Sequence, residues 1–206
     1  MSMTQSRIYL ASQSPRRREL LKQIGINFEL LLLRSDTQRN VDVDETPRPD
    51  EPAIAYVQRL CQEKAQAGFE SLVMRRLPAL PVLAADTIVT LDGNILGKPC
   101  NAEQAAVMLR TLSGREHQVM TAVAMAMKEH MEVRLSVSTV RFTTLDEERI
   151  RHYLQSGEYS DKAGSYGIQG LAGAFIEQLS GSYSGVMGLP LFETTELLRH
   201  FDIPAP

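Results

Sequence analysis

The chain has 206 residues, of which 43% are hydrophobic, and a formal net charge of −3, so it can bury one substantial core. The negative balance argues against a broad nucleic-acid surface, which needs many lysine and arginine contacts to phosphate. No apolar run is long enough to cross a bilayer, and the N-terminus lacks a signal-peptide core. The two cysteines, Cys61 and Cys100, have neither metal-type nor redox-type spacing. We therefore expect a cytoplasmic protein with free thiols that binds neither nucleic acid nor membranes.

The N-terminal segment predicts a strand over residues 7–11, a polar turn, and a helix over residues 15–24. Ser14 is a good N-cap, and Pro15 suits the first helical position. The first turn of a helix has partial positive charge and unsatisfied N–H groups, so stability alone would favour acids there. This turn instead contains three cations, Arg16, Arg17 and Arg18. A bound anion, phosphate above all, would resolve the conflict; alternatively, the arginines point into solvent or pair with acids.

Strand and helix signals alternate along the first two thirds of the chain, which favours an α/β architecture. Further strands are expected at residues 28–33, 80–91, 118–127, 133–142 and 174–179, with a short hairpin arm at 95–96. Further helices are expected at residues 53–67, 102–112, 145–156 and 191–201. Gly68 is the expected C-cap of the first of these helices. Asn101 with Gln104, and Thr144 with Glu147, resemble capping boxes.

Asp86 interrupts an apolar strand, and an ionised carboxylate in a dry core needs a partner or a metal. At a strand end facing a cleft it could bind a divalent cation or orient a water; alternatively, it caps a turn or pairs with a buried arginine. Lys64 and Lys98 would each, alone, be interpreted as solvated surface charges. Together with Arg16 and Arg17 they supply the cations that cleavage within a polyphosphate needs.

Residues 161–170 are too glycine-rich for a simple helix. Glycines at every third position, 164, 167 and 170, permit tight turns and close approach of the backbone to a ligand. Gln169 can both donate and accept hydrogen bonds, as the edge of a nucleobase requires. The pattern is neither a Walker motif nor a dinucleotide fingerprint. The alternative is a structural loop with Gln169 in solvent.

Taken in order over residues 8 to about 201, the motifs resemble those of the Maf family of nucleoside triphosphate pyrophosphatases. They are Ser12-x-Ser14-Pro15-Arg16-Arg17, Glu63-Lys64-Ala65, Ala85-Asp86-Thr87, Gly97-Lys98-Pro99, Asp161-Lys162-Ala163-Gly164-x-Tyr166-Gly167-Ile168-Gln169-Gly170 and Gly188-Leu189-Pro190. The resemblance implies an α/β fold in which an elongated mixed sheet with flanking helices forms two lobes around a cleft, similar to inosine triphosphate pyrophosphatases. It implies a single domain over residues 1–206 with interwoven lobes, and hydrolysis of a nucleoside triphosphate to the monophosphate and pyrophosphate.

The resemblance also implies roles for individual residues. Asp86 is the expected catalytic proton acceptor and, with Glu45, the expected ligand of a divalent metal, Mg²⁺ or Mn²⁺. Asp36 or Asp44 are alternatives to Glu45, because the loop at residues 34–44 is longer than we expect for the family. Substrate binding is assigned to Ser14, Arg16, Lys64, Lys98, Asp161 and Lys162.

Three positions are expected to set substrate choice: Arg17, Thr87 and Gln169. They resemble the branch of the family that hydrolyses dTTP and UTP, whose thymine or uracil edge has two carbonyls flanking one N–H and so matches a glutamine amide. A purine would leave buried polar groups unpaired. The expected function is therefore clearance of noncanonical or excess pyrimidine nucleotides. Alternatives are hydrolysis of 7-methyl-GTP, or nucleotide-dependent regulation of septum formation; a homodimer is one option for assembly.

Overall fold

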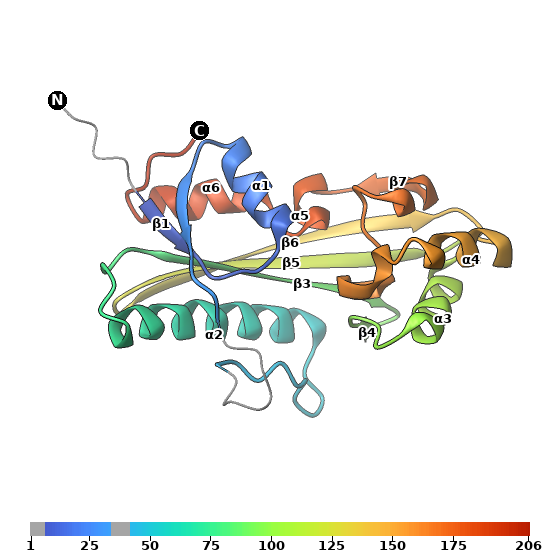
Figure 1. Cartoon of the computed structure of the whole chain (residues 1–206), viewed down its shortest axis with the longest axis horizontal. Helices are drawn as coiled ribbons and strands as arrows, with labels where there is room; N and C mark the ends of the chain where they lie inside the picture. Colours follow the sequence, from blue (N-terminus) through green and yellow to red (C-terminus); the bar gives the residue numbers. More distant parts are fainter. Residues whose placement is uncertain (1–6, 34–41) are drawn as a thin grey trace. The chain divides into compact units, whose positions relative to one another are not determined.

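The computed structural model describes residues 7–33 and 42–206. Within them, a seven-stranded sheet has the order β2-β1-β3-β5-β6-β7, with β4 paired to β3 (Figure 1). The strands are β1 Arg7–Leu10, β2 Asn27–Leu30, β3 Val82–Leu91, β4 Asn94–Leu96, β5 Glu116–Met127, β6 His130–Phe142 and β7 Ile176–Ser180. The helices are α1 Pro15–Gln23, α2 Ala53–Met74, α3 Ala102–Leu112, α4 Glu147–Gln155, α5 Tyr183–Met187 and α6 Leu191–His200, with short 3₁₀ turns η1 Glu158–Asp161, η2 Ala163–Ser165 and η3 Leu171–Phe175.

The sheet is mixed, because β1 pairs in parallel with β2 and β3, whereas β4 and β7 pair antiparallel with their neighbours. This confirms the predicted mixed sheet with flanking helices. In the part of the chain that the structure describes, no helix is long and apolar enough to span a membrane.

The chain divides into two compact units, each assembled from separate segments. Unit 1 comprises Met1–Asp86, Thr121–Leu135 and Gly188–Pro206, and unit 2 comprises Thr87–Met120 and Ser136–Met187. The long strands β3, β5 and β6 contribute residues to both. The single domain with two lobes around a cleft stays a prediction.

In unit 1, α2 covers one face of the strands, and α1 and α6 cover the other (Figure 1). The expected C-cap at Gly68 is wrong, because α2 continues to Met74. Gly68 is buried inside the helix, where a Cβ atom would lie only 2.8 Å from a methyl carbon of Val82. This glycine therefore permits close packing of α2 on β3, and the helix ends at Arg75 instead.

Two predicted helix caps differ from the structure. Ser14 occupies the N-cap position of α1, but its hydroxyl makes no capping hydrogen bond; its N–H donates to the Ser12 hydroxyl at 3.2 Å. Helix α4 is capped by Asp146, not Thr144, and the Asp146 carboxylate accepts from the N–H of Arg149 at 2.8 Å. The helix begins two residues later than the threonine cap implied, so the capped N–H group is that of Arg149 and not that of Glu147.

The core of unit 2 contains a histidine. His117 on β5 is 3% exposed, and its Nε2 lies 2.7 Å from the hydroxyl of Tyr166. The ring of Phe142 packs edge-on against both rings, with centroids 4.9 Å from that of His117 and 4.8 Å from that of Tyr166. Burial lowers the pKa of His117 to about 4, against a smaller opposing effect of the Arg115 backbone, so the imidazole is neutral at neutral pH.

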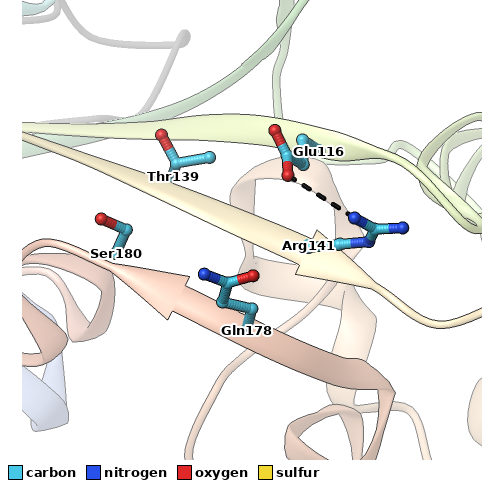
Figure 2. A pocket seen from close by; sticks show the side chains of 5 residues that line it. All are labelled: Glu116, Thr139, Arg141, Gln178 and Ser180. Atoms are coloured by element: carbon cyan, nitrogen blue, oxygen red, sulfur yellow. Dashed lines mark ion pairs between the residues drawn. The ribbon is translucent and has the colours of Figure 1, made fainter.

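Unit 2 also has a polar pocket on its surface. Figure 2 shows a pocket on the strands β5, β6 and β7, where Arg141 lies 3.8 Å from Glu116. The pocket is lined by Glu116, Thr139, Arg141, Gln178 and Ser180. None of the site residues expected from the sequence lines it, so this pocket is not the predicted site.

We expect acid to destabilise the protein through His117. Because the ordinary pKa of 6.5 falls to about 4 in the folded protein, the unfolded chain binds a proton between these values while the folded chain does not. Stability is therefore fully present above pH 6.5 and falls as the pH drops towards 4, by about 3 kcal/mol. Urea unfolding across this range measures the loss.

The variant His117→Gln should lack this part of the pH dependence, whereas His152→Gln, at an exposed position of α4, should keep it. Equal pH dependence in the two variants would contradict the assignment.

Candidate active site

One lysine of unit 1 joins the two acids expected at the site. The ammonium of Lys64 lies 2.6 Å from a carboxylate oxygen of Asp86 and 2.7 Å from one of Glu45. The side chains of Lys64 and Asp86 are only 16% and 14% exposed, whereas Glu45 is more open, at 57%. The structure thus brings together the expected catalytic acid Asp86, the expected second carboxylate Glu45, and Lys64, one of the residues expected to bind substrate.

The sequence explains why this charge cluster forms where it does. Asp86 follows four fully buried residues of β3, so its carboxylate leaves the apolar interior at this point of the strand. Lys64 lies on the inward face of α2, next to buried Ala65 and one turn after buried Cys61. Burial alone would lower the pKa of Lys64, but Asp86 and Glu45 outweigh it and raise that pKa. Lys64 therefore stays protonated between the two carboxylates.

The loop before α2 is fastened to the helix by two side chains that sequence reasoning missed. The Tyr56 hydroxyl donates to the Glu45 carbonyl at 2.8 Å. The Arg59 guanidinium donates to both carboxylate oxygens of Glu51, at 2.6 and 2.8 Å, and to the Thr46 carbonyl at 3.2 Å. Hydrogen bonding to Arg59 lowers the pKa of Glu51 to about 2, so the pair stays ionised at neutral pH. The spacing of Tyr56 and Arg59 on one helical face was the available signal.

The described carboxylates considered for the site have different partners. Glu45 reaches Lys64, whereas the Asp44 carboxylate accepts from the Thr46 N–H at 2.9 Å. Asp36, the third alternative, lies outside the described residues.

Arg17 is turned inward from the start of α1. Its Nε donates to the Gly188 carbonyl at 2.8 Å, and one Nη donates to the Ala85 carbonyl at 2.7 Å and the Ser12 hydroxyl at 3.2 Å. Burial lowers the pKa of Arg17, and the charge of Asp86 opposes that shift. An arginine nevertheless remains charged. The guanidinium therefore joins the turn before α1, the residue preceding Asp86 and the segment before α6.

Among the other expected site residues, Ser14 and Arg16 lie half-buried at the start of α1 in unit 1. The rest belong to unit 2: Thr87, Lys98, Asp161, Lys162 and Gln169. Lys98 is exposed on the turn after β4, and Thr87 is half-buried on β3. The Lys162 ammonium lies 2.6 Å from the Asp161 carboxylate and also donates to the Glu158 carbonyl. Lys162 is thus folded back into its own loop. Gln169 is exposed.

The two carboxylates beside Lys64, those of Asp86 and Glu45, are candidate metal ligands. Among the described residues, no group of three or more histidine, cysteine, aspartate or glutamate side chains is arranged to hold a metal ion. Asp86 and Glu45 nevertheless converge on one point, and Mg²⁺ is typically held by one or two carboxylates with water and phosphate oxygens. The donor set fits a hard divalent cation that arrives with a phosphate ligand.

These features belong to a recognised class of proteins. The model of the family described as Maf-like protein matches residues 7–201. The chain belongs to this family.

Among its relatives, a protein of Aromatoleum aromaticum named dTTP/UTP pyrophosphatase is 55% identical over 205 residues, 99% of this chain and 100% of that protein. Proteins with the same name from Nitrosomonas europaea and Dechloromonas aromatica are 55% and 52% identical; the alignments cover 95% of this chain and of the first protein, and 94% of this chain and 96% of the second. The solved structure of the Staphylococcus aureus Ham1 protein aligns with 66% of this chain and 72% of its own, at 18% identity and a TM-score of 0.45, too low to support any conclusion.

We expect Arg17→Lys to destabilise the protein, because a lysine cannot reach three acceptors on separate segments and leaves carbonyl groups unpaired. The free energy of unfolding should fall by about 2 kcal/mol. Arg18→Lys, on the next residue of α1, should change it by less than about 0.5 kcal/mol. Urea unfolding of the three proteins tests this, and equal stability of the two variants would show that the inward hydrogen bonds of Arg17 contribute nothing.

Proposed function

We propose that this protein hydrolyses dTTP and UTP to the nucleoside monophosphate and pyrophosphate. The observation that carries the proposal is the Lys64 ammonium held between the carboxylates of Asp86 and Glu45. Relatives at 52–55% identity that are named dTTP/UTP pyrophosphatases support it. Phosphoanhydride cleavage uses a group that orients the attacking water and cations that neutralise phosphate oxygens, and Asp86 and Lys64 are residues of these two kinds.

The reaction that we propose is attack of water on the α-phosphorus. Asp86 accepts the proton of the attacking water, and the bond from the α-phosphorus to the bridging oxygen breaks, so that the oxygen leaves with pyrophosphate. Lys64 holds the Asp86 carboxylate in place by charge and hydrogen bonding. Four residues are assigned to the polyphosphate: Ser14, Arg16, Lys64 and Lys98. Asp161 and Lys162 are also assigned to substrate binding.

Asp86 and Glu45 would hold a divalent metal, Mg²⁺ or Mn²⁺, which supplies charge neutralisation of the phosphate oxygens when bound. The two carboxylates and the Lys64 ammonium together carry one net negative charge. Asp86 and Glu45 therefore still attract a cation with Lys64 in place.

We propose that three residues select the nucleobase: Gln169, Thr87 and Arg17. The exposed amide of Gln169 has one donor and one acceptor for the paired carbonyl and N–H of uracil or thymine. We propose that Arg17 acts on this choice indirectly, because its guanidinium donates to two carbonyls and a hydroxyl of the protein itself.

The proposed setting is the cytoplasm, where the enzyme would clear noncanonical or excess pyrimidine nucleotides, with homodimerisation as one option. Hydrolysis of 7-methyl-GTP, and regulation of septum formation without catalysis, are the competing functions. A regulator has no need for an acid held ready by Lys64, which favours catalysis.

A nucleotide panel tests the proposed activity. With Mg²⁺ or Mn²⁺, the wild type should release pyrophosphate from dTTP and UTP, detected as phosphate after added inorganic pyrophosphatase. Asp86→Asn should lower kcat by about a thousandfold, because an amide accepts no proton from water. Asp202→Asn, on an exposed turn after α6, is the matched control and should retain full activity. Activity confined to 7-methyl-GTP, or full activity of Asp86→Asn, would overturn the proposal.

Substrate choice has a separate test. Gln169→Glu replaces the amide donor with a second acceptor, so kcat/KM for UTP should fall by about tenfold or more, since the lost donor leaves a uracil carbonyl unpaired. Gln178→Glu, an exposed glutamine on β7, should leave kcat/KM unchanged. Unchanged UTP hydrolysis by Gln169→Glu would remove Gln169 from base recognition.

A further inference from the structure

We propose that Tyr166 and His117 are positioning residues for Gln169, acting through the buried hydrogen bond between them. The inference rests on the proposed function, since it concerns how the protein selects a uracil or thymine base. Neither side chain touches a ligand in this account. Both fix the conformation of the glycine-rich loop from which Gln169 projects.

The hydrogen bond is well placed for this role. Tyr166 is 5% exposed and His117 is 3% exposed, with 2.7 Å between the phenol oxygen and Nε2. Burial raises the pKa of Tyr166 and lowers that of His117, so the phenol keeps its proton and the imidazole is neutral. The phenol can therefore donate to Nε2, and the bond joins strand β5 to the loop without introducing a buried charge.

The loop is also fastened on the N-terminal side of Tyr166. The N–H of Gly164 donates to the Gly97 carbonyl at 3.1 Å, and the Ser165 hydroxyl lies 3.0 Å from the Met108 sulfur on α3. A side chain at Gly164 is disfavoured, because a Cβ atom would lie only 3.0 Å from Val89 and φ is +66°. Gly97 directly precedes Lys98, so the same contacts fix the turn that carries this lysine.

The backbone of Ser165 is strained, and the surrounding structure holds it in this conformation. The residue is fully buried with φ +66°, a left-handed conformation that costs a non-glycine residue about 1 kcal/mol or more. Such a residue persists only where its surroundings determine it. The hydrogen bond of the adjacent Tyr166 is part of those surroundings.

On the C-terminal side, the loop is fastened again close to Gln169. The Glu158 carboxylate accepts from the N–H of Leu171 at 3.0 and 3.2 Å, and the N–H of Gly170 donates to the Gly167 carbonyl at 3.1 Å. The exposed Gln169 therefore lies on a short turn between two fixed points, Tyr166 and Leu171. Releasing Tyr166 frees one end of that turn, which would let the Gln169 amide leave the orientation that a pyrimidine edge requires.

The test is selectivity between UTP and CTP, because cytosine has an amino group where uracil has a carbonyl. Tyr166→Phe keeps the ring and removes only the hydroxyl. We expect KM for UTP to rise by about tenfold, the UTP-to-CTP ratio of kcat/KM to fall by about fivefold or more, and kcat to fall by less than about threefold. Tyr183→Phe, at an exposed tyrosine of α5, is the matched control and should behave as wild type.

A double-mutant cycle separates positioning from general weakening. Gln169→Ala should itself abolish the selectivity, and Tyr166→Phe in that background should reduce the UTP-to-CTP ratio no further, because both changes act on the same amide. If the two losses multiply instead, Tyr166 does not act through Gln169, and the inference is wrong.

If Tyr166→Phe does not fold, His117→Phe breaks the same hydrogen bond with a ring of similar size and should give the same loss of selectivity. A wild type that does not distinguish UTP from CTP would overturn the proposed function. A wild type that distinguishes them, with Tyr166→Phe and His117→Phe distinguishing them equally well, would overturn only this inference.

Discussion

The ion-pair bridge from Asp86 through Lys64 to Glu45 is the interaction on which the rest of unit 1 depends. A carboxylate at the end of four buried strand residues is costly unless it is paired, and removing one member of such a cluster leaves an uncompensated charge. The bridge requires α2 to lie close to β3, which Gly68 permits. It also requires a fixed loop before α2, which Tyr56 and Arg59 secure through the backbone of Glu45 and Thr46. The packing of α2 on β3 and the anchored loop before α2 therefore both hold the cluster of Asp86, Lys64 and Glu45 together.

The three arginines at the start of α1 have different surroundings, although they are adjacent in sequence. The first turn of this helix contains no acid, and Arg17 avoids the unfavourable helix end by turning inward to carbonyl groups of two other segments. Part of the conflict between cations and helix dipole is therefore resolved within the protein. Arg16 remains the residue assigned to a bound anion. The carbonyl of Ala85 that accepts from Arg17 immediately precedes Asp86, so the arginine fixes the backbone beside the proposed base.

The sequence predicted most elements because their signals are local. Periodicity and turn residues located the strands, and Asn101 caps α3 as its spacing to Gln104 indicated. The failures came from tertiary contacts: Gly68 continues a helix because β3 packs against it, and Asp146 replaces Thr144 as a cap. In the site, Asp86 stood out as a charge within an apolar strand, whereas Lys64 became informative only together with the other cations, Arg16, Arg17 and Lys98. Tyr56, Arg59 and His117 did not stand out, because a tyrosine, an arginine on a helix and a histidine in a strand become informative only when their partners are known.

Attack of water at the α-phosphorus fixes which phosphoanhydride bond breaks, and product analysis by phosphorus NMR tests this most directly. With UTP and Mg²⁺ or Mn²⁺, attack at the α-phosphorus gives UMP and pyrophosphate in equal amounts, with no UDP at any time in the reaction. In water enriched in oxygen-18, the label should appear in UMP and be absent from pyrophosphate. Formation of UDP and orthophosphate, or label in pyrophosphate, would contradict the account.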